Sequence, residues 1–205
     1  MTFVNETIDL LSKDLEKKYK INIVETKDKL ILALWVFSMS RAAKESPVIN
    51  AVIDSDMKNV TYREYVDIIV PIVNDKETVN VVIRNAESKS YIQIFKELLS
   101  LNEKVKSGKL FIEDLVGGTL SVNPYSDSLV GLNSIEDGTT CKVGLNKVEK
   151  RPYCVNNNPK KIEKRDIMMV SLTYDHRLID GREGVLYLRR IKEIMENPLR
   201  LFMEV

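Results

Sequence analysis

The sequence has little cysteine and no long apolar run. Its 205 residues include only two cysteines, Cys141 and Cys154, which lack the close spacing of a zinc or redox motif. A disulfide-rich fold and a metal site built on cysteine are therefore excluded, and we expect a reducing compartment. The most apolar stretch, residues 30–39, is shorter than the roughly 18 residues that suggest a membrane span, so no membrane is expected as a partner.

An excess of charge of either sign is also absent. The chain has 31 basic and 30 acidic side chains, which gives no field that would attract DNA, RNA or anionic lipid. Nucleic acid is therefore not expected as a partner. The length suits one domain with its own core, and no repeat or internal linker interrupts the sequence, so we expect a single domain over residues 1–205.

Apolar residues recur at helical spacing in four segments, and short β-branched segments lie between them. The helices are predicted at residues 5–20, 27–44, 90–106 and 182–196. The second is apolar on all sides, which predicts that it is packed between other elements. Strands are predicted at residues 48–54, 65–73, 79–85, 119–122, 141–148 and 167–174. The fold class is therefore α/β.

The only histidine lies between the last predicted strand and the last predicted helix. The segment YDHRLIDGREG places His176 four residues before Asp180, in a loop of the kind that often carries catalytic groups. An imidazole titrates near 6.5 and a thiol near 8.5, so a histidine suits the deprotonation of a thiol. Without its surroundings, a lone histidine beside acids and arginines is more often a hydrogen-bonded structural residue than a base.

The longer string around His176 resembles the signature of the dihydrolipoyl acyltransferases, which form the cores of 2-oxoacid dehydrogenase complexes. The similarity includes SLTYDHRLIDGREGV, IKEIMENPLRLFMEV and LFIEDLVGGTLSV, in the family's order, and looks closest to the succinyltransferase branch. It implies an acyltransferase catalytic-core domain without lipoyl or subunit-binding domains. It also implies a chloramphenicol-acetyltransferase-like two-layer α/β sandwich, with a mixed sheet flanked by helices.

The resemblance further implies an assembly and a location. Family members form trimers with active sites between subunits, and the trimers join into a larger cage with the other 2-oxoacid dehydrogenase components. Coenzyme A is a substrate, and the lipoyl group comes from another domain or chain. The expected location is the mitochondrial matrix, or the cytoplasm of a bacterium.

Roles for individual residues follow from the same resemblance. His176 would take the proton from the thiol of coenzyme A or of dihydrolipoamide, so that the thiolate attacks the acyl thioester. Asp180 would orient the loop through an ion pair. Asp175 and Arg177 would hold the neighbouring backbone, and Gly181 completes the motif; an ordinary surface charge is the alternative for Arg177. No metal site is expected.

The position of the oxyanion-binding hydroxyl departs from the family's pattern. Family members present a serine or threonine hydroxyl that binds the oxyanion, but this chain has Leu132 at that position, and leucine cannot donate a hydrogen bond. Ser134 and Ser128 lie close enough in sequence to replace the hydroxyl if the loop register differs.

Three functions remain open at this point. The first is an active acyltransferase, in which succinyl is the expected acyl group. The second is a catalytically silent paralogue that assembles in the core, alone or in a hetero-trimer where His176 works with a neighbour's hydroxyl; Leu132 favours this alternative. The third is a free-standing chloramphenicol-type acetyltransferase, whose motif begins with paired histidines. Here Asp175 precedes His176, which argues against it.

Overall fold

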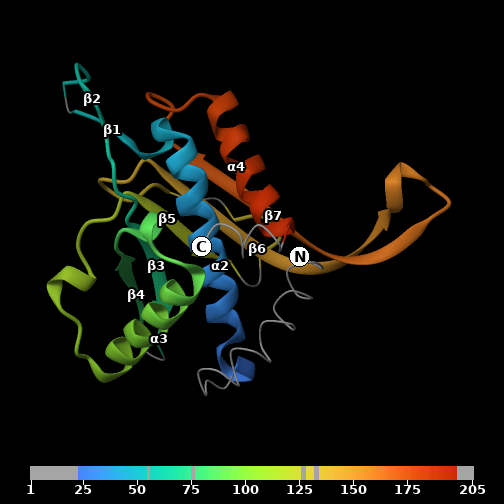
Figure 1. Cartoon of the computed structure of the whole chain (residues 1–205), viewed down its shortest axis with the longest axis horizontal. Coiled ribbons are helices and arrows are strands. Elements are labelled where there is room, and N and C mark those ends of the chain that lie inside the picture. Colours follow the sequence, from blue (N-terminus) through green and yellow to red (C-terminus); the bar gives the residue numbers. More distant parts are fainter. Residues whose placement is uncertain (1–22, 55, 75–76, 126–127, 132–133, 198–205) are drawn as a thin grey trace.

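In a computed structural model, the described residues form a mixed β-sheet with three helices on one face and a separate two-stranded sheet (Figure 1). The structure describes residues 23–54, 56–74, 77–125, 128–131 and 134–197. The predicted helix at residues 5–20 lies outside these ranges. In the part described, no helix is long and apolar enough to cross a membrane.

The main sheet has five strands in the order β4-β3-β5-β6-β7. Their bounds are Ile68–Val73 (β3), Thr78–Ile83 (β4), Leu120–Pro124 (β5), Cys141–Cys154 (β6) and Ile162–Tyr174 (β7). β5 pairs in parallel with β3 and β6, whereas the β3–β4 and β6–β7 pairs are antiparallel. A separate antiparallel pair is formed by β1 (Ala51–Ile53) and β2 (Val60–Tyr62).

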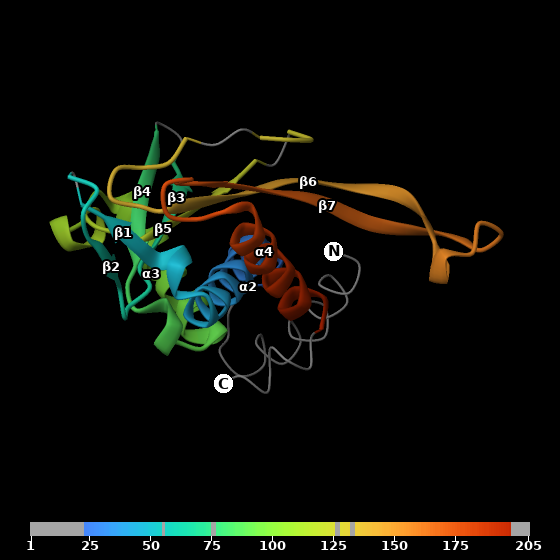
Figure 2. The same ribbon diagram turned by 90° about the horizontal axis from the view of Figure 1, so that it is seen from above.

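The helices α2 (Ile23–Glu45), α3 (Tyr91–Ser107) and α4 (Gly181–Glu196) cover the same face of the sheet (Figure 2). Helix α2 contacts both α3 and α4, and every side chain from Ala33 to Ser40 is buried. The prediction of a helix packed on all sides is confirmed. Its two buried serines need no outside partner, because the hydroxyls of Ser38 and Ser40 donate to the carbonyls of Leu34 and Phe37 at 2.8 Å.

Helix α3 follows the predicted bounds because both of its ends carry specific signals. The Ser90 hydroxyl accepts a hydrogen bond from the Gln93 backbone, while the Gln93 side chain accepts one from the Ser90 backbone. Gly108 ends the helix in the left-handed conformation at φ +66°. Residues 48–50 of the strand predicted at 48–54 instead belong to a 3-10 turn, η1 (Pro47–Asn50), whose first position is Pro47.

The strands β6 and β7 are longer than predicted and form a hairpin that projects beyond the body of the molecule (Figure 2). The pairing is irregular between Leu145 and Val148, where the ribbon leaves the body. From Pro152 to Lys164 nearly every described side chain is exposed. Near the body, Met169 is about half exposed.

A buried aspartate ties the start of β3 to the end of β4. The Asp67 side chain is only 6% exposed; its carboxylate accepts from Arg84 Nη1 at 2.9 Å and from the Asn85 backbone at 2.7 Å. Arg84 Nη2 in turn donates to the carbonyls of Glu113 and Val116. One ion pair therefore joins two strands to the segment that leads into β5.

We expect Asp67→Ala to lower the free energy of unfolding by about 3 kcal/mol, because it removes one partner of a largely buried ion pair and leaves the Asn85 N–H without its acceptor. The fall in melting temperature would be about 6–12 °C for a chain of this size. Glu103→Ala is the matched control, because Glu103 is 75% exposed and its pair with Lys106 is a surface contact. Similar melting temperatures for the two variants would contradict the prediction.

The two cysteines lie in opposite environments. Cys141 is fully buried at the start of β6, and burial raises the pKa of its thiol to about 12; Cys154 is exposed at the far end of the hairpin. We expect a thiol reagent to label one cysteine per chain in the folded protein, and the second only after unfolding. Peptide mapping should place the fast label on Cys154. Rapid labelling of both thiols would show that the start of β6 opens readily.

Candidate functional site

The loop that carries His176 joins the end of β7 to the start of α4. The Asp175 backbone N–H donates to the Thr140 carbonyl at 2.9 Å, which fixes the loop to the residue before β6. The backbone N–H groups of Leu178 and Ile179 both donate to the Asp175 carbonyl, and the Ile179 side chain is fully buried. The short turn at His176 is therefore held from both sides.

His176 itself is exposed in the described structure. Its ring lies beside that of Tyr174, with centroids 5.6 Å apart and planes inclined by 42°. Tyr174 in turn packs against α4, where a Cβ atom on Gly184 would lie only 3.1 Å from the tyrosine ring. The absence of a side chain at Gly184 thus lets α4 approach Tyr174, next to the histidine.

Asp175 and Arg177 form an ion pair within this loop. Asp175 Oδ1 accepts from the backbone N–H and Nε of Arg177, and Oδ2 accepts from Nη2 at 2.6 Å. The side-chain hydrogen bond from Arg177 is the main cause that lowers the pKa of Asp175. Because the pKa of Asp175 is lower in the folded protein, the ionised carboxylate stabilises the fold at pH values above the ordinary pKa of about 4. This contribution is lost as the pH falls through the folded-state pKa.

Asp180 is the N-cap residue of α4. Its carboxylate accepts from the Arg182 backbone at 3.2 Å and caps the N-terminus of α4, while its carbonyl accepts from the Gly184 N–H. No ion pair to Asp180 occurs among the described residues. Among the described residues Asp180 is thus a helix cap, because the unpaired N–H groups and positive end of a helix stabilise a carboxylate there. Gly181 is the first residue of α4.

The described parts of the connection between β5 and β6, residues 125, 128–131 and 134–140, lie on the sheet face opposite the helices (Figure 2). Leu132 lies outside the described residues. The two alternative hydroxyls are described: Ser128 Oγ donates to the Val130 carbonyl at 3.0 Å, and Ser134 is exposed. The structure therefore describes the chain on both sides of Leu132.

Polar groups on the sheet hold this segment in place, and the sequence reasoning missed them. Gly131 is bound through its N–H by Asn146 Oδ1 and through its carbonyl by Ser171 Oγ. The Glu136 carboxylate accepts from Ser121 Oγ at 2.5 Å and from Lys142 Nζ. The sequence signal that could have found them is the alternation of side chains along β6. Cys141, Val143 and Leu145 pack in the core, so the polar residues Lys142 and Asn146 point to the opposite face of the sheet.

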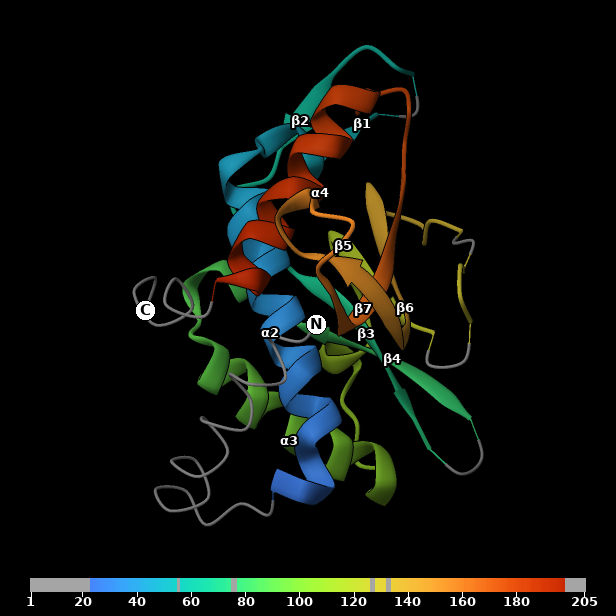
Figure 3. The same ribbon diagram turned by 90° about the vertical axis from the view of Figure 1, so that its right-hand side faces the viewer.

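Arg63, the residue after β2, also contacts the segment that leads into β6. Arg63 Nη2 donates to the Gly138 carbonyl at 2.9 Å, two residues before Thr140. The segment 138–140 thus contacts Arg63 on one side and the His176 loop on the other. Figure 3 shows the β7–α4 loop at the same end of the molecule as β1 and β2. Sequence reasoning missed this contact because nothing in the spacing pairs residues 75 positions apart.

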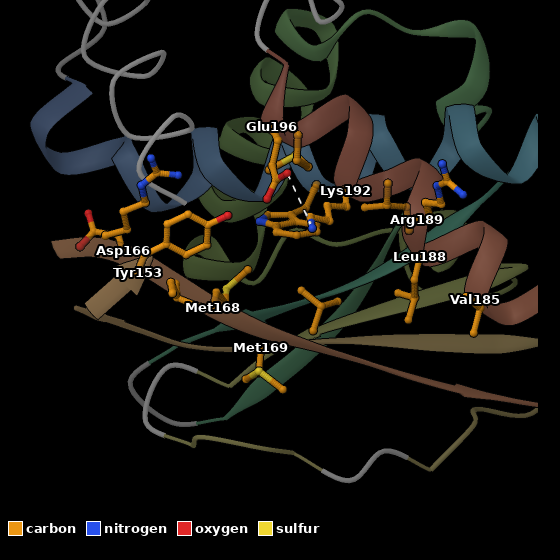
Figure 4. Close-up of a pocket in the computed structure, with 15 residues that line it drawn as sticks. Tyr153, Asp166, Met168, Met169, Val185, Leu188, Arg189, Lys192 and Glu196 are labelled. Atoms are coloured by element: carbon orange, nitrogen blue, oxygen red, sulfur yellow. Dashed lines mark ion pairs between the residues drawn. The ribbon is translucent and has the colours of Figure 1, made fainter. Parts of the chain in front are cut away.

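A cavity of about 730 Å³ between β7 and α4 is lined mainly by apolar side chains, Met168, Met169, Val185 and Leu188 among them (Figure 4). None of the site residues predicted from the sequence lines it.

In the described part of the chain, no group of three or more histidine, cysteine or acidic residues could hold a metal ion. On the β7–α4 loop, the exposed imidazole of His176 is accessible for proton transfer.

Two curated relatives of this chain are succinyltransferase components of the 2-oxoglutarate dehydrogenase complex. This chain is 36% identical over 207 residues to the mitochondrial dihydrolipoyllysine-residue succinyltransferase component of the 2-oxoglutarate dehydrogenase complex of Saccharomyces cerevisiae. The match covers 99% of this chain and 44% of that protein. The component from Sus scrofa is 39% identical over 176 residues, covering 85% and 38%. The chain thus spans less than half the length of these relatives.

Solved structures agree on the fold. A probable dihydrolipoamide acetyltransferase from Listeria monocytogenes superposes with a TM-score of 0.84 at 24% identity, covering 95% of this chain and 80% of that one. A chloramphenicol acetyltransferase superposes with a TM-score of 0.53 at 15% identity, covering 80% and 77%. The expected α/β sandwich is confirmed. The model of the family described as 2-oxoacid dehydrogenases acyltransferase (catalytic domain) matches residues 4–203, so the chain belongs to that family.

Proposed function

We propose that this chain transfers an acyl group, succinyl in the first instance, between coenzyme A and dihydrolipoamide. The observation that carries the proposal is the turn at His176, which presents an exposed imidazole on a loop fixed by Thr140, Ile179 and the cap at Asp180. The succinyltransferase relatives support the choice of acyl group.

In the proposed reaction His176 accepts the thiol proton of one substrate, and the thiolate attacks the carbonyl carbon of the other substrate's thioester. The tetrahedral intermediate collapses, its carbon–sulfur bond to the leaving thiolate breaks, and that thiolate takes the proton back from the imidazolium. The acyl group thus moves from one sulfur to another without net oxidation. The Asp175–Arg177 pair and the Asp180 cap position the loop and take no proton.

The chain would act in the core of a 2-oxoacid dehydrogenase complex. We propose a homotrimer or hetero-trimer within a larger cage, in contact with the other dehydrogenase components, with the lipoyl group supplied by another domain or chain. The relatives named as complex components support this assembly, and their mitochondrial location supports a mitochondrial one here. The catalytically silent paralogue remains the second candidate, since Leu132 replaces the family's hydroxyl.

The test is acyl transfer by the purified protein to free dihydrolipoamide, with succinyl-coenzyme A and acetyl-coenzyme A compared at equal concentration. We expect transfer with a higher kcat/KM for the succinyl donor. Sedimentation should be measured on the same sample, to show whether trimers are present. A well-assembled trimer that transfers neither group would favour the silent paralogue.

A further inference from the structure

The imidazole of His176 has few restraints in the described structure. Its side chain is exposed, and among the described residues no hydrogen bond or ion pair reaches it. Its ring contact is with Tyr174, at a centroid distance of 5.6 Å. A side chain with free torsions samples several rotamers, whereas a general base works only with its nitrogen about 3 Å from the atom that gives up the proton. The tyrosine ring is therefore the neighbour that can select the orientation of the imidazole.

Tyr174 is itself held on two sides. It is the last residue of β7, where it pairs with the buried Cys141 of β6. Its ring lies along the first turn of α4: a Cβ atom on Gly184 would be 3.1 Å from the ring carbon Cε1, and one on Gly181 would be 3.9 Å from the hydroxyl. The half-buried side chain also packs against the main core. The ring thus has a fixed position beside the histidine.

Gly184 is the residue that makes this packing possible. Glycine weakens a helix relative to alanine, and Gly184 does not have the left-handed backbone conformation that would require a glycine. The nearest atoms that a side chain would meet at this position belong to the Tyr174 ring. The space that Gly184 leaves is therefore the space that the ring needs.

We infer that Tyr174 is a positioning residue for His176: its ring, held by Gly184 and by the end of β7, keeps the imidazole in the orientation in which it accepts the thiol proton. The inference rests on the proposed function, because this orientation matters only if the histidine is a base. In this role Tyr174 touches neither substrate and exchanges no proton. The ring of the tyrosine is needed and its hydroxyl is not.

The first test compares Tyr174→Phe with Tyr174→Leu. Phenylalanine keeps the ring and is the matched control, whereas leucine keeps an apolar side chain but removes the ring contact with His176. We expect Tyr174→Phe to stay within about twofold of the wild type in kcat, and Tyr174→Leu to lower kcat about 3–10-fold, the range for loss of one aromatic pair. KM for both substrates should change little, because the orientation of the base acts on the chemical step.

Gly184→Ala tests the same contact from the helix side. The added methyl group would lie 3.1 Å from the Tyr174 ring, so the ring must move by a few tenths of an ångström. We expect kcat to fall in this variant. The double variant Gly184→Ala/Tyr174→Leu should be no slower than Tyr174→Leu alone, because both changes act through one ring. Additive losses would contradict the role given to Gly184.

A measurement that needs no turnover uses the fact that the chain has one histidine. Isotope labelling of histidine gives a single imidazole Cε1–H signal in the NMR spectrum, and the ring current of an aromatic neighbour displaces that signal. We expect the signals of the wild type and Tyr174→Phe nearly to coincide, and that of Tyr174→Leu to move toward its position in the unfolded chain. Deuteration of the other residues keeps the signal observable in a large assembly.

The inference is overturned by a Tyr174→Leu variant as fast as the wild type, by a Tyr174→Phe variant as slow as Tyr174→Leu, or by a histidine signal that does not respond to loss of the ring. Should Tyr174→Leu fail to fold, Gly184→Ala decides alone, and an unchanged kcat and histidine signal in it would overturn the inference. A wild type that transfers no acyl group would refute the proposed function, while the histidine signal would still show whether Tyr174 fixes the imidazole.

Discussion

Replacing His176 by alanine is expected to lower kcat for acyl transfer by about 10²–10⁴-fold, the usual contribution of a positioned general base. Because the imidazole is exposed and its only described ring contact is with Tyr174, the melting temperature should stay close to that of the wild type. Steady-state kinetics with both substrates saturating would measure the fall in kcat, and circular dichroism the unchanged fold.

The informative control is Arg177→Ala on the same loop. It breaks the pair with Asp175 and leaves the imidazole, so a loss much smaller than that of His176→Ala would assign the chemistry to the histidine rather than to loop order. Equal losses in the two variants would contradict the assignment of His176 as base.

Replacing Leu132 by threonine is expected to raise kcat by up to about 100-fold. A hydroxyl at the position where family members carry one would donate to the oxyanion, and removal of one such donor in other enzymes costs about 10²–10³ in kcat. The gain should appear in kcat more than in KM, because the oxyanion forms only in the transition state.

The matched control is Leu132→Val, which changes size without adding a donor. Should both variants match the wild type, another group already binds the oxyanion, and Ser134→Ala would then identify or exclude the exposed serine beside the loop. A gain in Leu132→Val equal to that of the threonine variant would assign the effect to side-chain size.

Elements whose signals are local could be predicted closely. Helix α3 has an apolar stripe, a serine cap and a terminal glycine in sequence, and its predicted bounds at residues 90–106 differ from the observed Tyr91–Ser107 by one residue. The all-round burial of α2 followed from composition alone. The site loop could be placed because His176 lies just after a β-branched run and just before a helix start.

Features that depend on distant contacts could not be predicted. β2 is only three residues long and has no buried residue, so it leaves no alternating apolar pattern to detect. The outer parts of β6 and β7 are mostly polar and are kept as strands by pairing with each other rather than by a buried face. The contacts of Glu136 with Lys142 and of Arg63 with Gly138 arise only once the chain has folded, as does the choice of Asp180 as a cap.

The β6–β7 hairpin is packed in the sheet at one end and exposed to solvent at the other. Residues 141–145 are buried in the sheet, whereas the ribbon beyond Pro152 has nearly all its described side chains in solvent. A two-stranded ribbon is marginal by itself in water. The two ends of the same pair of strands therefore belong to different cooperative units: backbone amides near Val143 would exchange with solvent only when the whole domain opens, while those near the hairpin tip would exchange through local openings.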